Sequence, residues 1–316
     1  EKAGKIASKV RKEAVKKITA GMKVIDLVEW IESEIKSTGA GLSFPCNVSI
    51  NQIAAHYTSA PSDDTRFCYG DIVKIDLGAE VDGYISDTAV TVIVEGDNGE
   101  LVDEEGKAYN MPGRLDDGNP VVSEDEIEER RAIINASSCA LENAISIIKE
   151  GVTLNEIGYE VQKTMNDLGY NLTGHSLEQN NLHAGLSIPN YPDGSNHELK
   201  EGDHIAVEPF ATNGVGLVND IPQHYIYSFL RNRPMRQPDS KHLLNYIGNN
   251  LCYFPFARRH LLEVYDEHRL NRAIRPLISS RSIYPYNALK EKTDGMVAQT
   301  EHTIIVEKDG CCVTTL

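Results

Sequence analysis

The sequence has few basic residues, few cysteines and no long apolar segment, and each shortage excludes a class of protein. Its 316 residues contain 31 Lys and Arg against 47 Asp and Glu, a formal net charge of −16, which argues against nucleic-acid binding through a basic surface of the whole chain. The sequence contains no run of about 18 apolar residues, so no membrane-spanning helix is predicted. The first residues also lack the apolar core of a signal peptide. The six cysteines form no CxxC pair, so reduced thiols of a cytoplasmic protein are expected.

Composition and apolar periodicity predict a globular protein with several helices. Hydrophobic residues make up 41% and charged residues 25% of the chain, which is ordinary globular usage. The length allows two structural units, or one large domain with an insertion. Apolar residues recur at helical spacing over residues 5–37, where Gly21 divides two predicted helices. A further helix is predicted from Ser123, where Glu126 completes a capping box, and another over residues 154–168.

Residues 71–94 are predicted to form a β-hairpin. Both arms are rich in β-branched residues, and Asp82-Gly83 between them is typical of a tight turn. The following residues 95–129 contain thirteen acidic residues against two basic ones. We interpret residues 95–122 as an exposed acidic loop, which is long for a compact domain and therefore expected to be mobile or functional.

The sequence contains a short internal repeat. Segments that begin at Gly21 and Gly151 share glycine, apolar and acidic positions 130 residues apart. Two further segments match 132 residues apart, GDIVKID ending in Asp76 and GDHIAVE ending in Glu208. The match predicts two copies of a helix–helix–strand unit related by a pseudo-twofold axis, although a match this short can also arise by chance.

A segment of opposite charge follows the second copy. Residues 217–286 carry apolar residues at helical spacing, and residues 229–281 contain ten Lys and Arg against four Asp and Glu. We interpret residues 217–286 as an inserted helical subdomain. Its charge indicates either a docking face or ordinary solvated helices, and the sequence leaves both open.

Two carboxylates of the hairpin are the first candidates for chemistry. Alternate residues of a strand share a face, so Asp76 and Asp87 project to the same side. A two-residue turn places them diagonally and a one-residue bulge at Gly83 places them directly opposite, roughly 5–8 Å apart at Cβ in either register. Two such carboxylates repel one another unless a cation lies between them. Exposed strand aspartates are the alternative interpretation.

Three further polar residues favour the cation. His175 lies in LTGHSL. Glu208 lies in IAVEPF and Glu301 in MVAQTEHTIIV, and we interpret both of these segments as apolar strands. A charge in such surroundings is seldom buried unless it is paired or ligates metal. Four carboxylates would be neutralised by two divalent ions, and oxygen-rich ligation with one imidazole suits Mn, Fe, Co or Zn.

These motifs resemble those of a known family. The matching segments, in chain order, are residues 44–58 (FPCNVSINQIAAHYT), the hairpin, 174–185 (GHSLEQNNLHAG), 208–210 (EPF) and 299–303 (QTEHT). Together they resemble the type 2, archaeal and eukaryotic, methionine aminopeptidases of the M24 metallopeptidases. The resemblance implies an α+β pita-bread (creatinase/aminopeptidase) fold with a pseudo-twofold internal repeat. Residues 1–216 and 287–316 would form the catalytic domain, and residues 217–286 the helical insertion.

The resemblance assigns roles to the metal ligands. Asp76 would chelate one ion, while Asp87 and Glu301 would bridge both ions. His175 and Glu208 would complete the coordination of the second ion, and Glu208 would also act as the proton shuttle.

The resemblance also assigns residues that contact the substrate. His56 and His183 would bind the substrate and stabilise the tetrahedral intermediate, and Phe44, Phe210 and Tyr286 would line the methionine pocket. From the residues alone, hydrogen-bonded core histidines and plain core aromatics remain the alternatives. His224 is a less certain pocket candidate, and His302 is expected to point to the opposite strand face.

The implied activity is removal of the N-terminal initiator methionine by attack of a metal-bound hydroxide, with a preference for a small second residue. The implied cofactors are two divalent metal ions, Co, Mn, Fe or Zn. The implied partners are N-terminal Met peptides and nascent chains in the cytoplasm. A monomer with no membrane and no specific nucleic-acid partner is expected, and contact with the ribosome is left open.

Two other functions remain as alternatives. A prolidase-like Xaa-Pro dipeptidase shares the five-ligand pattern, but such enzymes usually carry an extra N-terminal domain, and only 43 residues precede Phe44. A non-catalytic adaptor of the same fold that binds RNA or ribosomes would be expected to lack metal ligands, and all five are present.

Overall fold

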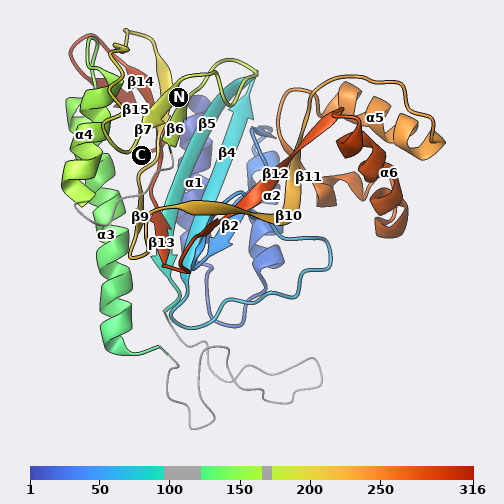
Figure 1. Cartoon of the computed structure of the whole chain (residues 1–316), viewed down its shortest axis with the longest axis horizontal. Helices are drawn as coiled ribbons and strands as arrows, with labels where there is room; N and C mark the ends of the chain where they lie inside the picture. The colour runs from blue at the N-terminus through green and yellow to red at the C-terminus, as the bar shows by residue number, and fades with distance from the viewer. Residues whose placement is uncertain (96–121, 166–172) are drawn as a thin grey trace.

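The computed structural model describes residues 1–95, 122–165 and 173–316. Figure 1 shows two strand-and-helix halves side by side, with a pair of helices at one edge. The acidic loop predicted at 95–122 falls, except for its two end residues, outside the described residues. The predicted end of the helix at 166–168 also lies outside them. No described helix is long and apolar enough to cross a membrane.

The N-terminal half is a four-stranded antiparallel sheet covered by two helices. The strand order is β1-β4-β2, and β5 pairs with the other edge of β4. Apolar side chains on one face of each helix are buried against this sheet, as the helical spacing predicts. The elements are α1 (Lys2–Val15), α2 (Val24–Ser37), β1 (Gly41–Leu42), β2 (Asn47–Ile50), β4 (Ile72–Val81) and β5 (Tyr84–Ile93). The short strand β3 (Ile53–Ala55) follows β2 but pairs outside this sheet.

The C-terminal half repeats this plan. Its five-stranded sheet has the order β15-β14-β8-β6-β7, and α3 and α4 pack their apolar faces on it. A short pair, β13-β9, lies beside it. The elements are α3 (Glu124–Ile147), α4 (Leu154–Met165), β6 (Thr173–Ser176), β7 (Ser187–Pro189), β8 (His204–Val207), β9 (Phe210–Thr212), β13 (Val297–Gln299), β14 (His302–Val306) and β15 (Cys311–Val313).

The repeat predicted from the sequence is present in the backbone. Gly21 and Gly151 both have left-handed conformations, with φ of 87° and 85°. Each lies just before the second helix of its half and donates its amide to a carbonyl 2.8 Å away, that of Phe67 before β4 or that of Leu199 before β8. Gly70 and Gly202, with φ of 86° and 91°, each donate to a carbonyl 2.9 Å away at the end of a neighbouring strand. Each glycine is therefore required by a turn that both halves use. The equivalent of Gly39, Gly169, lies outside the described residues.

The hairpin has the two-residue turn rather than the bulge. β4 and β5 pair as far as Val81 and Tyr84, which leaves Asp82 and Gly83 as the turn, with φ of 55° and 82°. Positive φ at both central residues matches the twist of the flanking strands. The register is therefore the diagonal one of the two that the sequence allows.

Capping boxes begin both helices of the C-terminal half. At α3, the amide of Ser123 donates to Glu126 at 2.8 Å, and the amide of Glu126 donates to the Ser123 hydroxyl at 3.3 Å, as predicted. Thr153 and Glu156 make the same pair of bonds before α4, at 2.8 and 3.2 Å. The second box follows the same Ser/Thr-x-x-Glu spacing.

The basic segment has helices and an apolar core of its own. Two antiparallel strands lead into it and back, and Figure 1 shows its helices at the edge of the molecule, beyond the two halves. Side chains from both helices are buried together with Tyr227 and Ile283 of the flanking strands. The elements are β10 (Val218–Phe229), α5 (Pro238–Asn250), β11 (Phe256–Ala257), η2 (Arg258–Leu261), α6 (Glu267–Ser279) and β12 (Ile283–Glu291).

Candidate active site

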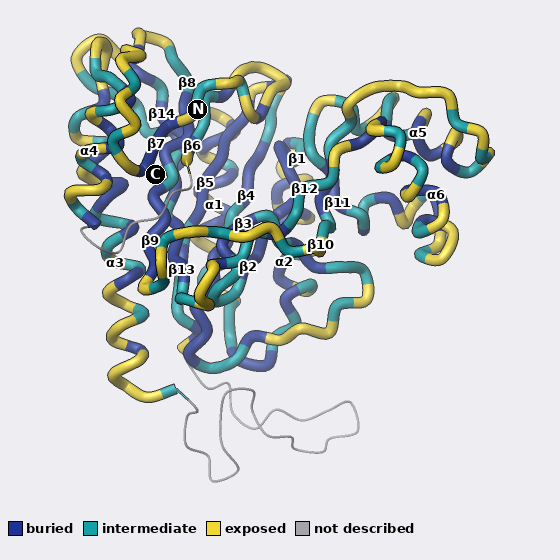
Figure 2. The backbone as a smooth tube through the Cα atoms, viewed as in Figure 1, coloured by how far each residue is buried: buried dark blue, intermediate teal, exposed yellow. Residues whose placement is uncertain are grey.

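One cavity, of about 390 Å³, lies between the two halves. Its lining comes from β4 and β5 of the first half, from β6 and the ends of β8 and β13 of the second, and from β10 and β12. The buried strands around it run through the middle of the molecule in Figure 2. All the metal ligands and substrate-contacting residues expected from the family resemblance border it: Phe44, His56, Asp76, Asp87, His175, His183, Glu208, Phe210, Tyr286 and Glu301. His224 is not among the lining residues.

Asp87 and Glu301 are brought together where the two halves meet. The amide of Asp87 donates to the Thr303 hydroxyl and that hydroxyl donates back to the Asp87 carbonyl, both at 2.7 Å. Glu301 and Ala89 exchange backbone hydrogen bonds of 3.0 and 3.3 Å. Glu301 thus lies in the break between β13 and β14, paired with Ala89 of β5 by an isolated bridge, and not inside one continuous strand as the sequence suggested.

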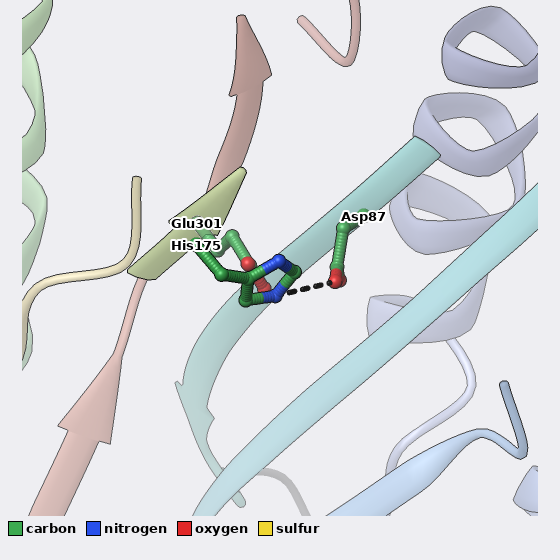
Figure 3. A group of neighbouring side chains, drawn as sticks. All are labelled: Asp87, His175 and Glu301. Atoms are coloured by element: carbon green, nitrogen blue, oxygen red, sulfur yellow. Dashed lines mark ion pairs between the residues drawn. The ribbon is translucent and has the colours of Figure 1, made fainter. Parts of the chain in front are cut away.

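His175 completes a compact group with these two carboxylates. Ligand atoms of Asp87, His175 and Glu301 all lie within 4.8 Å of one another, and the His175 Nε2 lies 3.5 Å from an oxygen of Asp87. Figure 3 shows the three side chains converging from β5, β6 and the segment before β14. The group joins donors from both halves.

Gly174 sets the position of His175. A Cβ at Gly174 would lie 2.2 Å from the Ala206 carbonyl oxygen on β8, so only glycine allows β6 to lie this close. We expect Gly174→Ala to force the strands apart, to lower the free energy of unfolding by about 1–3 kcal/mol and to weaken metal binding. Chelator competition and thermal unfolding measure both. Gly310→Ala is the control, because no atom lies within 4 Å of its new Cβ; equal effects in the two variants would contradict the role of Gly174.

Asp76 and Glu208 lie on the equivalent strands of the two halves and border the same cavity. Asp76 is in the middle of β4, and Glu208 follows the last residue of β8. Gln299 Nε2 donates to a Glu208 oxygen at 2.9 Å. The amide fixes the orientation of the Glu208 carboxylate within the cavity.

The charged forms of the buried carboxylates in this site are unfavourable unless a cation is bound. Burial, followed by the neighbouring carboxylates, raises the pKa of Asp76 and of Glu301 well above the usual range. Burial also raises the pKa of Glu208 to about 8. Burial lowers the pKa of His175, but the hydrogen bond and negative charge of Asp87 outweigh it and raise that pKa. Burial and neighbouring negative charge thus both oppose ionisation of these carboxylates, and a bound cation would counter both effects.

Buried ligand atoms without partners indicate that a metal fits here. Among the described residues, one carboxylate oxygen each of Asp76, Asp87 and Glu301 is buried and accepts no hydrogen bond, and His175 Nδ1 is also unpaired. Such atoms are costly in a folded protein unless something outside the chain satisfies them. Oxygen-rich donors with one imidazole match a catalytic divalent cation better than a structural zinc.

Two histidines face the same cavity from other directions. The ring of His183 lies 4.6 Å from that of His175, and the ring of His56 lies 5.5 Å from that of Tyr286. His56 Nδ1 lies 3.3 Å from the Asn287 carbonyl oxygen, and its backbone has φ of 59°. Burial lowers the pKa of both His56 and His183, which favours neutral imidazoles.

The remaining lining is largely apolar. Phe44 and Phe210 are buried and Tyr286 is half-buried. Several lining residues were not predicted from the sequence, including Asn47, Leu182, Ile226, Pro255, Leu289 and Gln299. Asn47 and Gln299 had a detectable signal, since both stand inside the motifs that carry the family resemblance.

His302 lies on the other side of its strand. Its Nδ1 is 2.8 Å from the Thr315 hydroxyl and 3.3 Å from an Arg11 nitrogen, and it does not line the cavity. Its position agrees with the alternation of side chains along a strand, which also directs Glu301 into the cavity.

Comparison with protein families identifies the chain. The model of metallopeptidase family M24 matches residues 1–112 and 116–308. The chain belongs to metallopeptidase family M24. A methionine aminopeptidase of Methanothermobacter thermautotrophicus is 48% identical over 99% of this chain and 97% of its own length. Membership of M24 implies the use of a divalent metal, in agreement with the unpaired ligand atoms.

Solved structures show the same fold at low sequence identity. A methionine aminopeptidase from Rickettsia prowazekii has a TM-score of 0.64 at 21% identity, covering 100% of this M24 chain and 94% of its own. A thermophilic Arx1 has a TM-score of 0.77 at 18% identity, and the match covers 99% of this chain and 88% of the Arx1 chain. A prolidase from Pyrococcus furiosus has a TM-score of 0.56 at 18% identity, and the match covers 100% of this chain and 62% of the prolidase chain. These similarities confirm the α+β pita-bread fold and do not by themselves specify the substrate.

Proposed function

We propose that this M24 protein is a methionine aminopeptidase that removes the initiator methionine from peptides and nascent proteins. The observation that carries the proposal is the convergence of Asp76, Asp87, His175, Glu208 and Glu301 in one cavity beside an apolar pocket. The identity of 48% to a methionine aminopeptidase over nearly the whole length of both chains supports it.

The five polar residues would together hold two divalent ions, Co, Mn, Fe or Zn. Ligand atoms of Asp87, Glu301 and His175 all lie within 4.8 Å of one another, which favours the two carboxylates as the bridging ligands. Asp76 and Glu208, one from each half, would complete the coordination of the two ions. When bound, such ions polarise a carbonyl and lower the pKa of water toward neutrality.

The protein side chains supply binding and proton transfer. Glu208 would accept a proton from the attacking water and return it to the leaving amine, with its carboxylate oriented by Gln299. His56 and His183 would donate hydrogen bonds to the substrate and to charge that develops on the carbonyl oxygen. Phe44, Phe210 and Tyr286 would enclose the methionine side chain.

The basic segment supports assignment to the type 2 form. We propose residues 217–286 as its inserted helical subdomain and residues 1–216 and 287–316 as the catalytic domain. The separate apolar core of α5 and α6 supports this division. Exposed arginines there, among them Arg231, Arg233 and Arg272, favour an anionic partner, so ribosome contact of a cytoplasmic monomer is part of the proposal.

The substrate class is tested by comparing Met-Ala-Ser with a Xaa-Pro dipeptide. We expect kcat/KM for Met-Ala-Ser to exceed that for the dipeptide by at least about 100-fold, because a pocket shaped for one side chain rejects a poor fit by about that factor. The manganese-loaded protein is used for both. Preference for the Xaa-Pro dipeptide would identify a prolidase instead, and a chain that binds no metal and cleaves neither would identify an adaptor.

A further inference from the structure

A buried ionic cluster connects the helical insertion to the first half of the molecule. Glu32 lies on α2, and Arg259 and His260 lie on η2, which is more than 220 residues away along the chain. Glu32 is 5% exposed and Arg259 is 9% exposed. None of the three lines the cavity or takes part in the proposed reaction.

The Arg259 guanidinium holds two segments of the first half at once. Its Nη2 donates to Glu32, which also accepts the amide of Cys46 at 3.0 Å. Its Nη1 donates to the Thr58 hydroxyl at 2.7 Å, and that hydroxyl donates to the Cys46 carbonyl at 2.7 Å. Both backbone groups of Cys46 are therefore fixed through side chains that Arg259 contacts.

His260 satisfies the second oxygen of the Glu32 carboxylate. The amide of Ala257 donates to His260 Nδ1 at 3.2 Å, so Nδ1 carries a lone pair and Nε2 carries the hydrogen. Nε2 lies 2.8 Å from Glu32 Oε2 and donates to it. These bonds and the charge of Arg259 lower the pKa of Glu32 despite its burial, so the carboxylate remains charged.

The segments that this cluster fixes are walls of the active-site cavity. Cys46 lies between Phe44 and Asn47, and both of these line the cavity. Thr58 is two residues after His56, whose left-handed backbone must be held by its surroundings. Pro255, which also lines the cavity, precedes η2 in the insertion. The cluster therefore joins three parts of the cavity wall.

We propose that Glu32, Arg259 and His260 are positioning residues that set the width of the methionine pocket and make the helical insertion part of the substrate site. This rests on the proposed function for the identity of the ligand. A buried ion pair often contributes little net stability compared with apolar residues of similar size. The planar fork of the Arg259 guanidinium, which reaches Glu32 with one nitrogen and Thr58 with the other, instead specifies how the insertion meets the pocket.

The test is a kinetic comparison on manganese-loaded protein. Arg259→Met, and the double variant Glu32→Gln/Arg259→Met, which removes both buried charges, are expected to raise KM for Met-Ala-Ser at least about tenfold, since small displacements of a site cost about that much or more. We expect kcat to change less than about threefold, because uniform binding is lost. Arg259→Lys keeps the positive charge but loses the planar fork of the guanidinium. Its KM for Met-Ala-Ser should therefore lie between those of wild type and Arg259→Met.

Arg269→Met is the matched control, since it removes an exposed ion pair of the same insertion, to Asp239 at 2.7 Å. Unchanged KM in the folded double variant, or equal KM in variant and control, would overturn the proposal.

A second readout does not depend on turnover: amide hydrogen exchange over residues 43–59 should be faster in the double variant and unchanged in the control. If wild-type protein cleaves no Met peptide but exchange responds, the proposed function fails and the positioning role stands; unchanged exchange refutes the positioning role.

Discussion

Asp87→Ala is expected to abolish peptide cleavage and to leave the fold intact. The carboxylate lies where the two halves meet, and its ligand atom is within 4.8 Å of those of His175 and Glu301, so its removal leaves Glu301 as the only one of the two proposed bridging carboxylates. Loss of even an outer-shell partner of a metal costs about 10- to 100-fold, and we expect a loss of at least about 1,000-fold here. Initial rates on Met-Ala-Ser with saturating manganese measure it.

The fold should survive because Asp87 adds to repulsion in the metal-free site. The hydrogen bonds that join Thr303 to Asp87 use only the Asp87 backbone, which the substitution keeps. Circular dichroism and thermal unfolding of the metal-free variant should therefore resemble wild type. Asp309→Ala, at an exposed turn, is the control. Turnover near the wild-type rate in Asp87→Ala would refute the bridging role.

The stability of the metal-free protein should fall as the pH rises from about 5 to 8. The pKa of Glu208 is raised from 4.5 to about 8 in the folded state, so the folded state binds its proton more tightly than the unfolded state in that window. The unfolding free energy then decreases with pH. The raised pKa values of Asp76, Glu301 and His175 act in the same direction.

The measurement is denaturant unfolding in the presence of a chelator across this pH range. Because one pKa unit corresponds to about 1.4 kcal/mol, the loss should amount to a few kcal/mol. Glu208→Gln removes the titrating group and should flatten the slope, which separates the site from other pH effects. Manganese should stabilise the wild type more at pH 8 than at pH 5.5. A metal-free stability that rises with pH, or equal slopes in both proteins, would contradict the charge balance described for the site.

The local features of the fold could be predicted from the sequence because each depends on neighbouring residues. Asp82-Gly83 specifies the turn, Ser123 and Glu126 specify the start of α3, and Gly21 marks the turn that separates α1 from α2. The diagonal position of Asp76 and Asp87 was one of two open registers. Only the pairing of the strands decided between them.

Features that depend on distant segments could not be predicted in the same way. That Glu301 lies at a break between two strands follows from its bridge to Ala89, more than 200 residues earlier. The contact of Arg259 with Glu32 likewise joins the insertion to the second helix. Gln299 and Asn47 could have been found, because each stands within a motif that carries the family resemblance.

The central claim is that five side chains from both halves hold divalent cations in one cavity, and anomalous diffraction from crystals grown with manganese tests it most directly. We predict two anomalous peaks, each contacted by oxygens of Asp87 and Glu301, with Asp76 on one side and His175 and Glu208 on the other. A map with no peak in the cavity, or with manganese bound only on the outer surface, would contradict the claim.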